Sequence, residues 1–307
     1  MMSSGSAITL AITGGTGFVG RHLLDLAIAD VHHVRALTRR DQSARKGVTW
    51  IKGDLSDVGA LCEGADAVVH VAGVVNARDE AGFRAGNVDG TATVIAAAEA
   101  ARVSRFVHVS SLAAREPELS RYGASKAAAD ALVRESDLDW TILRPPAVYG
   151  PGETERLDIY RLAQKGLGVA PGRGRFSLIY VTDLARALLA LATSAAGIGE
   201  TYEIEDGTGG LDHASFARLV GRGVGRDVRV ATLPLAALSV GAALDGLRAR
   251  IAGGLPKLSR DRARYIAHPD WTASVDPLVQ LGIWSPEVDP EVGIARTATW
   301  YREKGLI

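Results

Sequence analysis

The stretch from Ile8 to Gly20 reads ITLAITGGTGFVG and joins an apolar run to a helix through three evenly spaced glycines. Gly14 suits a tight turn, Gly17 lets the backbone approach a ligand closely, and Gly20 lets the helix pack on the strand. The N–H groups at the start of such a helix attract phosphate. Plain strand–helix connections also carry glycines, but at the first turn of an alternating chain this spacing favours a dinucleotide site made by Gly14, Thr16, Gly17, Phe18, Val19 and Gly20.

Strand-like and helix-like segments alternate through the first half of the chain, which predicts an α/β fold with a parallel sheet covered on both faces. Because crossovers between parallel strands are right-handed, we expect a doubly wound sheet that binds ligands at its carboxyl edge. The expected strands are Ile8–Thr13, His33–Thr38, Val48–Lys52, Ala67–Val71, Arg105–Ser110 and Trp140–Leu143, and the clearest helices are Asn87–Ala101 and Tyr122–Glu135.

Beyond Gly150 the alternation weakens, which predicts a second and smaller lobe. We expect Arg175–Val181, Thr182–Thr193 and Glu200–Ile204 to return to the sheet, and Leu211–Gly223, Pro234–Ala252, Ser259–Ala267 and Pro290–Glu303 to form a mostly helical lobe. The expected division is a cofactor-binding domain from residues 1–155 plus about 175–205, and a substrate-binding lobe from about 156–174 plus 206–307.

The overall composition excludes several classes of protein. The 307 residues contain 35 Lys and Arg against 35 Asp and Glu, so no excess charge draws the chain to nucleic acid or to an anionic membrane. A single cysteine, Cys62, excludes an internal disulfide and a cysteine-based metal cluster, and it suits a reducing cytoplasm. The short polar leader 1–6 does not resemble a signal peptide, and the longest apolar stretch, 233–244, is too short to span a bilayer. We therefore expect a cytoplasmic protein.

The end of the second strand bears on the choice of dinucleotide. Sites selective for NAD place an acidic residue there to accept the ribose hydroxyls, whereas this strand ends in Arg39 and Arg40. A guanidinium pairs with a 2′-phosphate and gains nothing from a free hydroxyl. The alternative is an ordinary solvated turn. The position of Arg39 favours NADP(H) over NAD(H) as the cofactor.

Two further strand ends lie at the expected carboxyl edge. Asp54 and Leu55 close the third strand, where an adenine amino group would lie, although Asp54 equally suits a helix cap near Asp57. The fourth strand ends in His70, which we expect to pack within the sheet rather than act as a catalyst. The small residues after it would let the backbone lie along the nicotinamide ribose; they are Val71, Ala72 and Gly73.

Three side chains with complementary chemistry follow the fifth strand. Ser111 ends that strand, and eleven residues later Tyr122 begins a helix that brings Lys126 to the same face. A tyrosine with its ordinary pKa of about 10 is a poor base at neutral pH, and a neighbouring ammonium stabilises the phenolate. We therefore expect Lys126, the positive charge of bound nicotinamide and the exclusion of water together to lower the pKa of Tyr122. Tyr122 would exchange a proton with a substrate oxygen that Ser111 binds, while hydride passes between the substrate and nicotinamide.

These features together resemble the extended short-chain dehydrogenase/reductase family, a Rossmann-type family that includes nucleotide-sugar epimerases and dehydratases, dihydroflavonol reductases and 3β-hydroxysteroid dehydrogenases. Besides the glycine turn and the trio Ser111, Tyr122 and Lys126, the resemblance is carried by Asp54-Leu55, Asn87–Thr91, Leu143–Gly152, Tyr180–Ala185 and Trp300–Arg302. It covers nearly the whole chain.

The resemblance also implies functions for particular residues. Asp54 and Leu55 would contact adenine, Tyr122 and Lys126 would contact the cofactor as well as act in catalysis, and Asn87 would support the site. The segment Leu143–Gly152 would border the nicotinamide and the substrate, with Pro145 and Val148 against the cofactor. Family members pair through two helices, so a homodimer formed by 87–101 and 122–135 is expected.

Two departures from the family pattern matter. The eleven residues between Ser111 and Tyr122 are fewer than in sugar epimerases and resemble atypical members, including the non-catalytic NADPH-binding accessory subunit of respiratory complex I. The long apolar segment Pro234–His268 is similar to that of members that take apolar or aromatic substrates. Its helix, 234–252, is interpreted as packed core, as a lid or as a membrane contact. Arg173, Arg175 and Arg260 are candidates for a diphosphate clamp or ordinary surface charges.

Three functions are compatible with these residues. The favoured one is an NADP(H)-dependent oxidoreductase that interconverts a secondary alcohol and the corresponding carbonyl compound in a small-molecule substrate. The second is a nucleotide-sugar epimerase or dehydratase with tightly bound NAD(P). The third is a non-catalytic NADPH-binding scaffold, which the presence of both Tyr122 and Lys126 disfavours.

Overall fold

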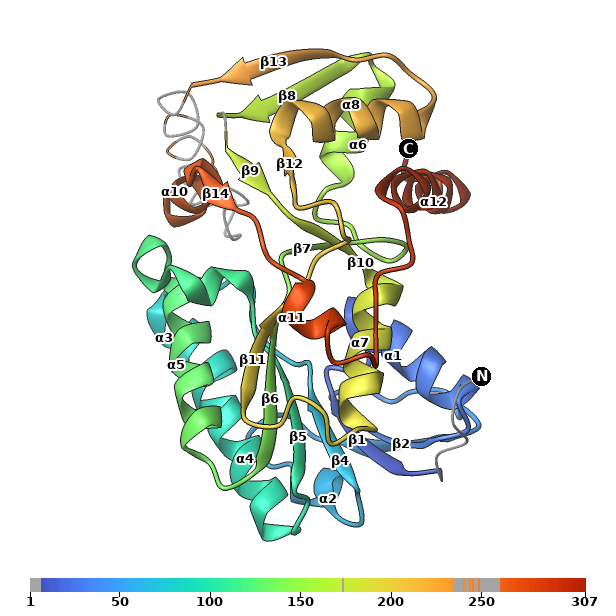
Figure 1. Cartoon of the computed structure of the whole chain (residues 1–307), viewed down its shortest axis with the longest axis vertical. Coiled ribbons are helices and arrows are strands. Elements are labelled where there is room, and N and C mark those ends of the chain that lie inside the picture. Colours follow the sequence, from blue (N-terminus) through green and yellow to red (C-terminus); the bar gives the residue numbers. More distant parts are fainter. Residues whose placement is uncertain are drawn as a thin grey trace.

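The computed structural model describes residues 7–172, 174–234 and 260–307, together with positions 240, 243, 245 and 248. A central parallel sheet of seven strands forms the lower part of the molecule (Figure 1). Across the sheet the strands are β11 (Glu200–Glu203), β6 (Asp139–Arg144), β5 (Arg105–Val109), β4 (Ala67–His70), β1 (Thr9–Thr13), β2 (His33–Thr38) and β3 (Val48–Lys52). The chain runs outward from β1 to β3 and then crosses to β4, so the strand order reverses between β1 and β4.

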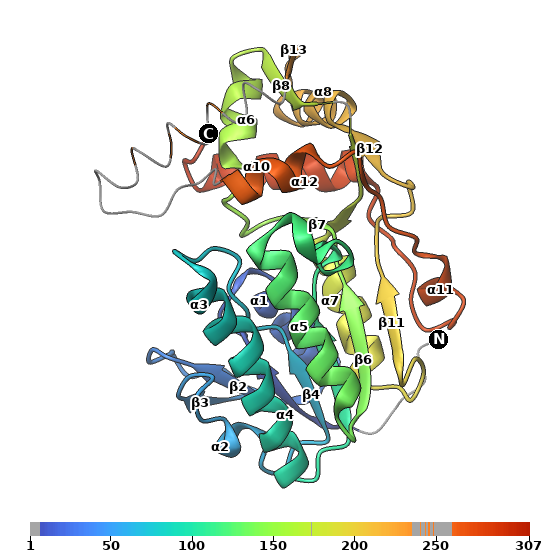
Figure 2. The ribbon, with the colours of Figure 1, turned by 90° about the vertical axis from the view of Figure 1, so that its left-hand side faces the viewer.

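Side chains of the strands alternate between the two faces of the sheet, and each face has its own core. Leu10 and Ile12 of β1 pack on the face covered by α1 (Phe18–Ala29) and α7 (Val181–Ala192). Ala11 packs on the opposite face. Figure 2 shows α4 (Gly90–Ala100) and α5 (Arg121–Glu135) in front of the sheet, with α1 and α7 behind it. The short helix α2 (Gly59–Cys62) also covers the α4 face, whereas α11 (Asp276–Val279) lies against the α7 face.

A second group of elements lies above the carboxyl edge of the sheet (Figure 1). It contains three small sheets: β7 (Ala147–Tyr149) with β10 (Leu178–Tyr180), β8 (Leu167–Pro171) with β13 (Arg229–Leu233), and β9 (Arg175–Phe176) with β12 (Leu211–Asp212) and β14 (Asp270–Trp271). Its helices are α6 (Leu157–Gln164), α8 (His213–Val224), α10 (Arg260–Ala267) and α12 (Pro290–Glu303). A third core, built around Tyr149, Tyr160 and Tyr301, holds this group together.

The strands and helices of the first half agree with the sequence predictions to within about two residues at most ends, and the doubly wound sheet is confirmed. The helix predicted from Asn87 begins earlier, as a π-helical turn over Arg84–Asp89 that continues into α4. Among the described residues, no helix combines the length and apolar character needed to cross a bilayer.

The prediction that Arg175–Val181 rejoins the central sheet is wrong. The segment divides at the buried Ser177 into β9 and β10, which pair with strands of the upper group. The Ser177 N–H donates to the carbonyl of Trp271 in β14, and its hydroxyl accepts from the N–H of Ala273 just after that strand, so its bonds do not go to β6 or β11. The upper group also contains more strand than the expected mostly helical lobe. Nearly all of the predicted helix Pro234–Ala252 lies outside the described residues. The same holds for Ser259, the first residue of the next predicted helix.

Candidate active site

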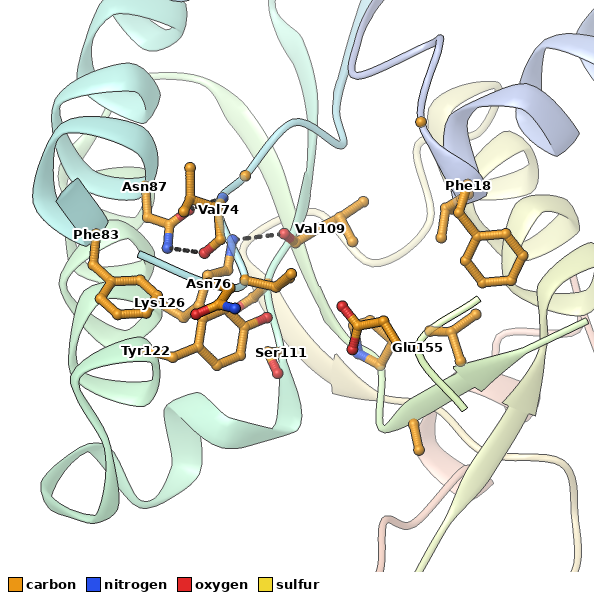
Figure 3. Close-up of a pocket in the computed structure, with 18 of the residues that line it drawn as sticks. Phe18, Val74, Asn76, Phe83, Asn87, Val109, Ser111, Tyr122, Lys126 and Glu155 are labelled. Carbon is orange, nitrogen blue, oxygen red and sulfur yellow. Dashed lines mark hydrogen bonds between the residues drawn. The ribbon is translucent and has the colours of Figure 1, made fainter. Parts of the chain in front are cut away.

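A cavity of about 1320 Å³ opens at the carboxyl ends of β1, β4, β5 and β6, beneath the upper group of elements (Figure 3). We name two parts of its lining. The glycine end is formed by Gly14, Gly17, Gly20, Ala72 and Gly73. The aromatic end is formed by Phe83 and Tyr265, near Tyr122. The cavity therefore combines the turn that opens the chain with elements far along the sequence.

The glycine end is made of main chain in close contact. Gly14 has a φ of 70°, and a Cβ there would lie 2.8 Å from the amide nitrogen of Ala72. A Cβ on Gly20 would collide with the carbonyl oxygen of Gly14, and one on Gly17 would lie 3.1 Å from the same oxygen. Gly17 caps α1 without a side-chain hydrogen bond, so the helix N-terminus faces the cavity uncapped. This cradle, which any side chain would fill, fits the pyrophosphate of a dinucleotide.

Hydrogen bonds behind β4 fix the next part of the glycine end. The Thr13 hydroxyl accepts from the Ala72 N–H at 3.1 Å and bonds to Nδ1 of His70 at 2.7 Å. Nε2 of His70 lies 3.0 Å from the hydroxyl of Thr91, which donates its own proton to the Asn87 carbonyl at 2.6 Å. His70 must therefore donate from Nε2 and accept at Nδ1, as a neutral ring. As predicted, His70 is a fully buried strand residue.

Asn87 connects the loop after β4 to the helix that carries Tyr122. Its side chain accepts from the Val74 N–H at 2.7 Å and donates to the Val74 carbonyl at 2.9 Å. The same amide donates to the Ser125 hydroxyl at 2.9 Å, and Ser125 donates to the carbonyl of Tyr122 at 2.8 Å. The π-helical turn places Asn87 in this position, as such turns often do at functional sites.

The short connection between Ser111 and α5 folds into two 3₁₀ turns, Leu112–Arg115 and Pro117–Leu119. Ser111 caps the first by accepting from the Ala113 N–H at 3.2 Å, and Ser120 caps α5 by accepting from Gly123 at 3.0 Å. A Cβ on Gly123 would lie 2.6 Å from the Ala113 carbonyl, so the turn and the helix touch. The short loop thus brings Ser111 and Tyr122 together in the cavity (Figure 3).

Burial dominates the electrostatics of the two titratable groups. It raises the pKa of Tyr122 above its ordinary value, a hydrogen bond from Ser111 opposes the shift, and Glu155 and Asp130 add to it. Lys126 donates to the Val109 carbonyl at 2.8 Å (Figure 3), and burial lowers its pKa to about 8. Burial of the phenol outweighs the hydrogen bond from Ser111, so the net shift in the pKa of Tyr122 is upward in this structure. Tyr122 is therefore a neutral phenol at neutral pH. The lowering expected from Lys126 together with bound nicotinamide stays a prediction.

Aromatic side chains and ion pairs surround the other end of the cavity. Phe83 ends the short helix α3 (Glu80–Phe83), and its ring lies 6.2 Å from that of Tyr122. Tyr265 of α10 stacks on Trp271 at 4.4 Å. Two ion pairs attach α10 to the cavity rim: Arg121 to Asp261 at 3.1 Å, and Arg262 to Glu155 at 2.9 Å. These arginines face carboxylates of the chain itself.

Most of the predicted site residues line the cavity, namely Gly14, Gly17, Phe18, Val19, Gly20, Val71, Ala72, Gly73, Ser111, Tyr122, Lys126, Pro145 and Val148. Thr16, Arg39, Asp54 and Leu55 lie outside its lining. Asp54 accepts from both the hydroxyl and the N–H of Ser56, which lowers its pKa, so it closes a turn. Leu55 packs against Gly90, where an added Cβ would lie 2.8 Å from Cδ1 of Leu55.

Of the three arginines considered as a diphosphate clamp, the structure describes the side chain of Arg175 alone. Arg175 donates to the carbonyls of Gly209 and Gly210, away from the cavity. Arg173 and the side chain of Arg260 lie outside the described residues. Four residues of the cavity lining were not predicted from the sequence: Phe83, Glu155, Arg262 and Tyr265. They share no motif, and only the fold brings them to the same cavity.

Known proteins resemble this chain over nearly its full length. Residues 14–194 match a protein-family model described as NAD(P)H-binding. The chain is 36% identical over 320 residues to a ceramide reductase of Caulobacter vibrioides, covering 100% of this chain and 98% of that protein. It is 32% identical over 264 residues to a Stigmatella aurantiaca ketoreductase of 4-hydroxy-2-methyl-3-oxo-4-farnesyl-3,4-dihydroquinoline-1-oxide, covering 76% of this chain and 78% of that protein.

A solved structure with the same fold is WbmH of Bordetella bronchiseptica in complex with NAD⁺. It superimposes with a TM-score of 0.76 at 19% identity and covers 97% of this chain and 99% of that one. At this identity the likeness supports the fold, and the two sequence relatives bear on the chemistry.

Proposed function

Because the chain belongs to the extended short-chain dehydrogenase/reductase family of NAD(P)-dependent enzymes, we propose that it reduces the ketone of a lipophilic substrate with NADPH. The observation that carries this proposal is the Tyr122 phenol beside Ser111, in the cavity that also contains the glycine turn. Burial raises the pKa of this phenol, which favours its protonated form. A phenol that stays protonated is the form required to donate a proton to a carbonyl oxygen.

Two sequence relatives support a ketone that carries a long apolar group. One is named as a ceramide reductase and the other as a ketoreductase of a farnesylated quinoline oxide. The aromatic end of the cavity, with Phe83 and Tyr265, suits such a substrate. The ion pairs of Arg121 and Arg262 with carboxylates leave this end poorly suited to a sugar diphosphate. The ketone corresponding to a ceramide is the first substrate to test.

Each residue of the trio has a separate task in the proposed reduction. Ser111 accepts from the Ala113 N–H and directs its own proton at Tyr122, and with a ketone bound that proton would hydrogen-bond the carbonyl oxygen instead. Reduced nicotinamide, when bound, supplies the hydride that adds to the carbonyl carbon. Tyr122 transfers its proton to the same oxygen, which becomes a hydroxyl. The ammonium of Lys126 then stabilises the charge that this transfer leaves on Tyr122.

The preference for NADPH rests on the end of β2. Arg39 and Arg40 are exposed there, where the adenine ribose of a dinucleotide in the glycine turn would reach. The first acidic residue beyond them, Asp41, is paired with Lys52 at 2.8 Å. Arg39 is thus the better placed of the charged groups to pair with a 2′-phosphate.

The test is NADPH oxidation by the purified chain with the ketone of a long-chain ceramide, using UDP-glucose as the comparison substrate. We expect the lipid to be reduced stoichiometrically with NADPH, and the sugar nucleotide to cause no net oxidation. Tyr122→Phe should lower kcat by about 10²–10⁴-fold with an unchanged Kd for NADPH, because only the proton donor is lost. Tyr202→Phe, in β11 outside the cavity, is the matched control. Full turnover by Tyr122→Phe would reject the proposed proton donor.

A further inference from the structure

A layer of buried polar side chains lies between the sheet and α5, directly behind the proposed proton donor. His70 of β4, His108 of β5 and Asp130 of α5 are fully buried, and Lys126 is 3% exposed. Tyr122, Lys126 and Asp130 follow one another at four-residue intervals, so Asp130 continues the same face of α5 one turn further. The proposed reaction uses the first two of these side chains and leaves Asp130 without a function.

The two histidines of the layer differ in their hydrogen bonds. The rings of His70 and His108 stack at 5.4 Å on neighbouring strands. Both nitrogens of His70 are bonded, to Thr13 and Thr91. Neither nitrogen of His108 has a hydrogen-bond partner in the described part of the chain, and its Nε2 lies 3.6 Å from Oδ1 of Asp130. Burial and the charge of Lys126 hold the pKa of His108 well below its usual value, so His108 remains neutral.

Asp130 uses only one of its two oxygens for strong bonds. Oδ2 accepts from Nε and Nη2 of Arg144 at 2.9 and 2.8 Å, and Arg134 lies 3.8 Å from it. Oδ1 has no hydrogen-bond partner in the described structure and faces the neutral His108. Arg144 thus holds the carboxylate in place, while Oδ1 faces His108 in the layer that also contains Lys126.

A buried ammonium without a counter-charge loses its proton readily. Burial lowers the pKa of Lys126 to about 8, and the carboxylate of Asp130 opposes that shift. The titratable or charged groups around Lys126 are Tyr122, Asp130 and Arg134 of α5, His70 of β4, His108 of β5 and Arg144 of β6. Asp130 is the one carboxylate among them, and its Oδ1 accepts no hydrogen bond in the described structure.

We propose that Asp130 is a positioning residue whose carboxylate, held by Arg144, keeps the buried Lys126 side chain in its ammonium form. The inference rests on the proposed function only where it predicts the effect of Asp130 on turnover. The charge state of Lys126 is a property of the protein by itself, so it is testable without substrate or cofactor.

The first test compares melting temperatures at pH 6.5 and pH 9.5 for the parent chain and for Asp130→Asn. Asparagine keeps an acceptor for Arg144 but removes the charge. We expect the variant to lose about 3 °C more at pH 6.5 than at pH 9.5, because only a charged Lys126 needs the counter-charge. Asp183→Asn is the matched control, since Asp183 is a buried acid paired with Arg186 at 2.9 Å in α7. Its loss should be the same at both pH values.

A double variant keeps the test decisive even if Asp130→Asn alone does not fold. In Asp130→Asn/Lys126→Met no ammonium remains, so adding Asp130→Asn to Lys126→Met should cost less stability at pH 6.5 than adding it to the parent. If Asp130→Asn costs as much stability in the Lys126→Met background as in the parent, or if neither Asp130→Asn nor the double variant folds, the carboxylate serves Arg144 and the fold, and the proposal is overturned.

Turnover supplies an independent readout. In Asp130→Asn the alkaline decline of kcat should begin at least about one pH unit lower than in the parent, with the acidic side unchanged. A uniform loss at every pH would contradict the proposal. If no ketone is reduced at all, the proposed function fails, while the melting temperatures still decide whether Asp130 holds Lys126 charged.

Discussion

The two ends of the cavity are built in different ways. The glycine end is main chain from segments that directly follow β1 and β4, and its contacts leave no room for side chains. The aromatic end is assembled from side chains of α3, the loop at Glu155 and α10, which lie far apart in the sequence. The first end is therefore constrained by backbone geometry, whereas the second can change one side chain at a time.

The strongest test of this contrast is Gly20→Ala. Its methyl group would collide with the Gly14 carbonyl oxygen, so the turn must open and the cradle is lost. We expect NADPH to bind about 100-fold more weakly, or the fold to be destabilised by about 3 kcal/mol. Calorimetric binding and thermal melting measure the two outcomes.

Gly59→Ala provides the matched control, because a Cβ at the start of α2 meets only Oδ1 of Asp57, at 3.8 Å. It should bind NADPH and melt like the parent. Parent-like NADPH affinity in Gly20→Ala would show that the close packing of the turn is not what forms the cofactor site.

The contrast also explains what the sequence could predict. The spacing of Gly14, Gly17 and Gly20 and the residues Ser111, Tyr122 and Lys126 are local patterns, and the structure brings them to one cavity. Strands β2 and β3 were predicted to the residue because polar turns flank their apolar runs. Each of these predictions needed only neighbouring residues and the rule that parallel strands share one carboxyl edge.

The features that local patterns did not predict depend on long-range information. Arg175–Val181 has the composition of a central strand, yet Ser177 bonds to Trp271 and Ala273, almost a hundred residues away. The pKa of Tyr122 depends on how deeply the fold buries its phenol, which helix spacing cannot indicate. Tyr265 reaches the cavity only because α10 is attached at its rim.

A smaller effect is expected at Arg39, which lies at the end of β2 beyond the cavity lining. Arg39→Ala should weaken NADPH binding about 10- to 30-fold, because a charge-assisted hydrogen bond to the 2′-phosphate is lost. Binding of NADH should change less than about twofold. Titration of both dinucleotides against the same protein measures the ratio. Equal losses for both dinucleotides would show that Arg39 does not bind the 2′-phosphate. Selectivity for NADPH would then have to come from another residue.

The smallest effect belongs to the aromatic end, where single side chains are expected to tune affinity. Phe83→Leu removes the ring that lies 6.2 Å from Tyr122 but keeps an apolar side chain. Aromatic pairs contribute about 0.5–1.5 kcal/mol, so KM for the lipophilic ketone should rise about fivefold, with the Kd for NADPH unchanged. Phe106→Leu makes the same replacement at a fully buried position of β5. It should lower the melting temperature without changing KM. If instead Phe83→Leu weakens NADPH as much as the ketone, the two ends are coupled and cannot vary separately.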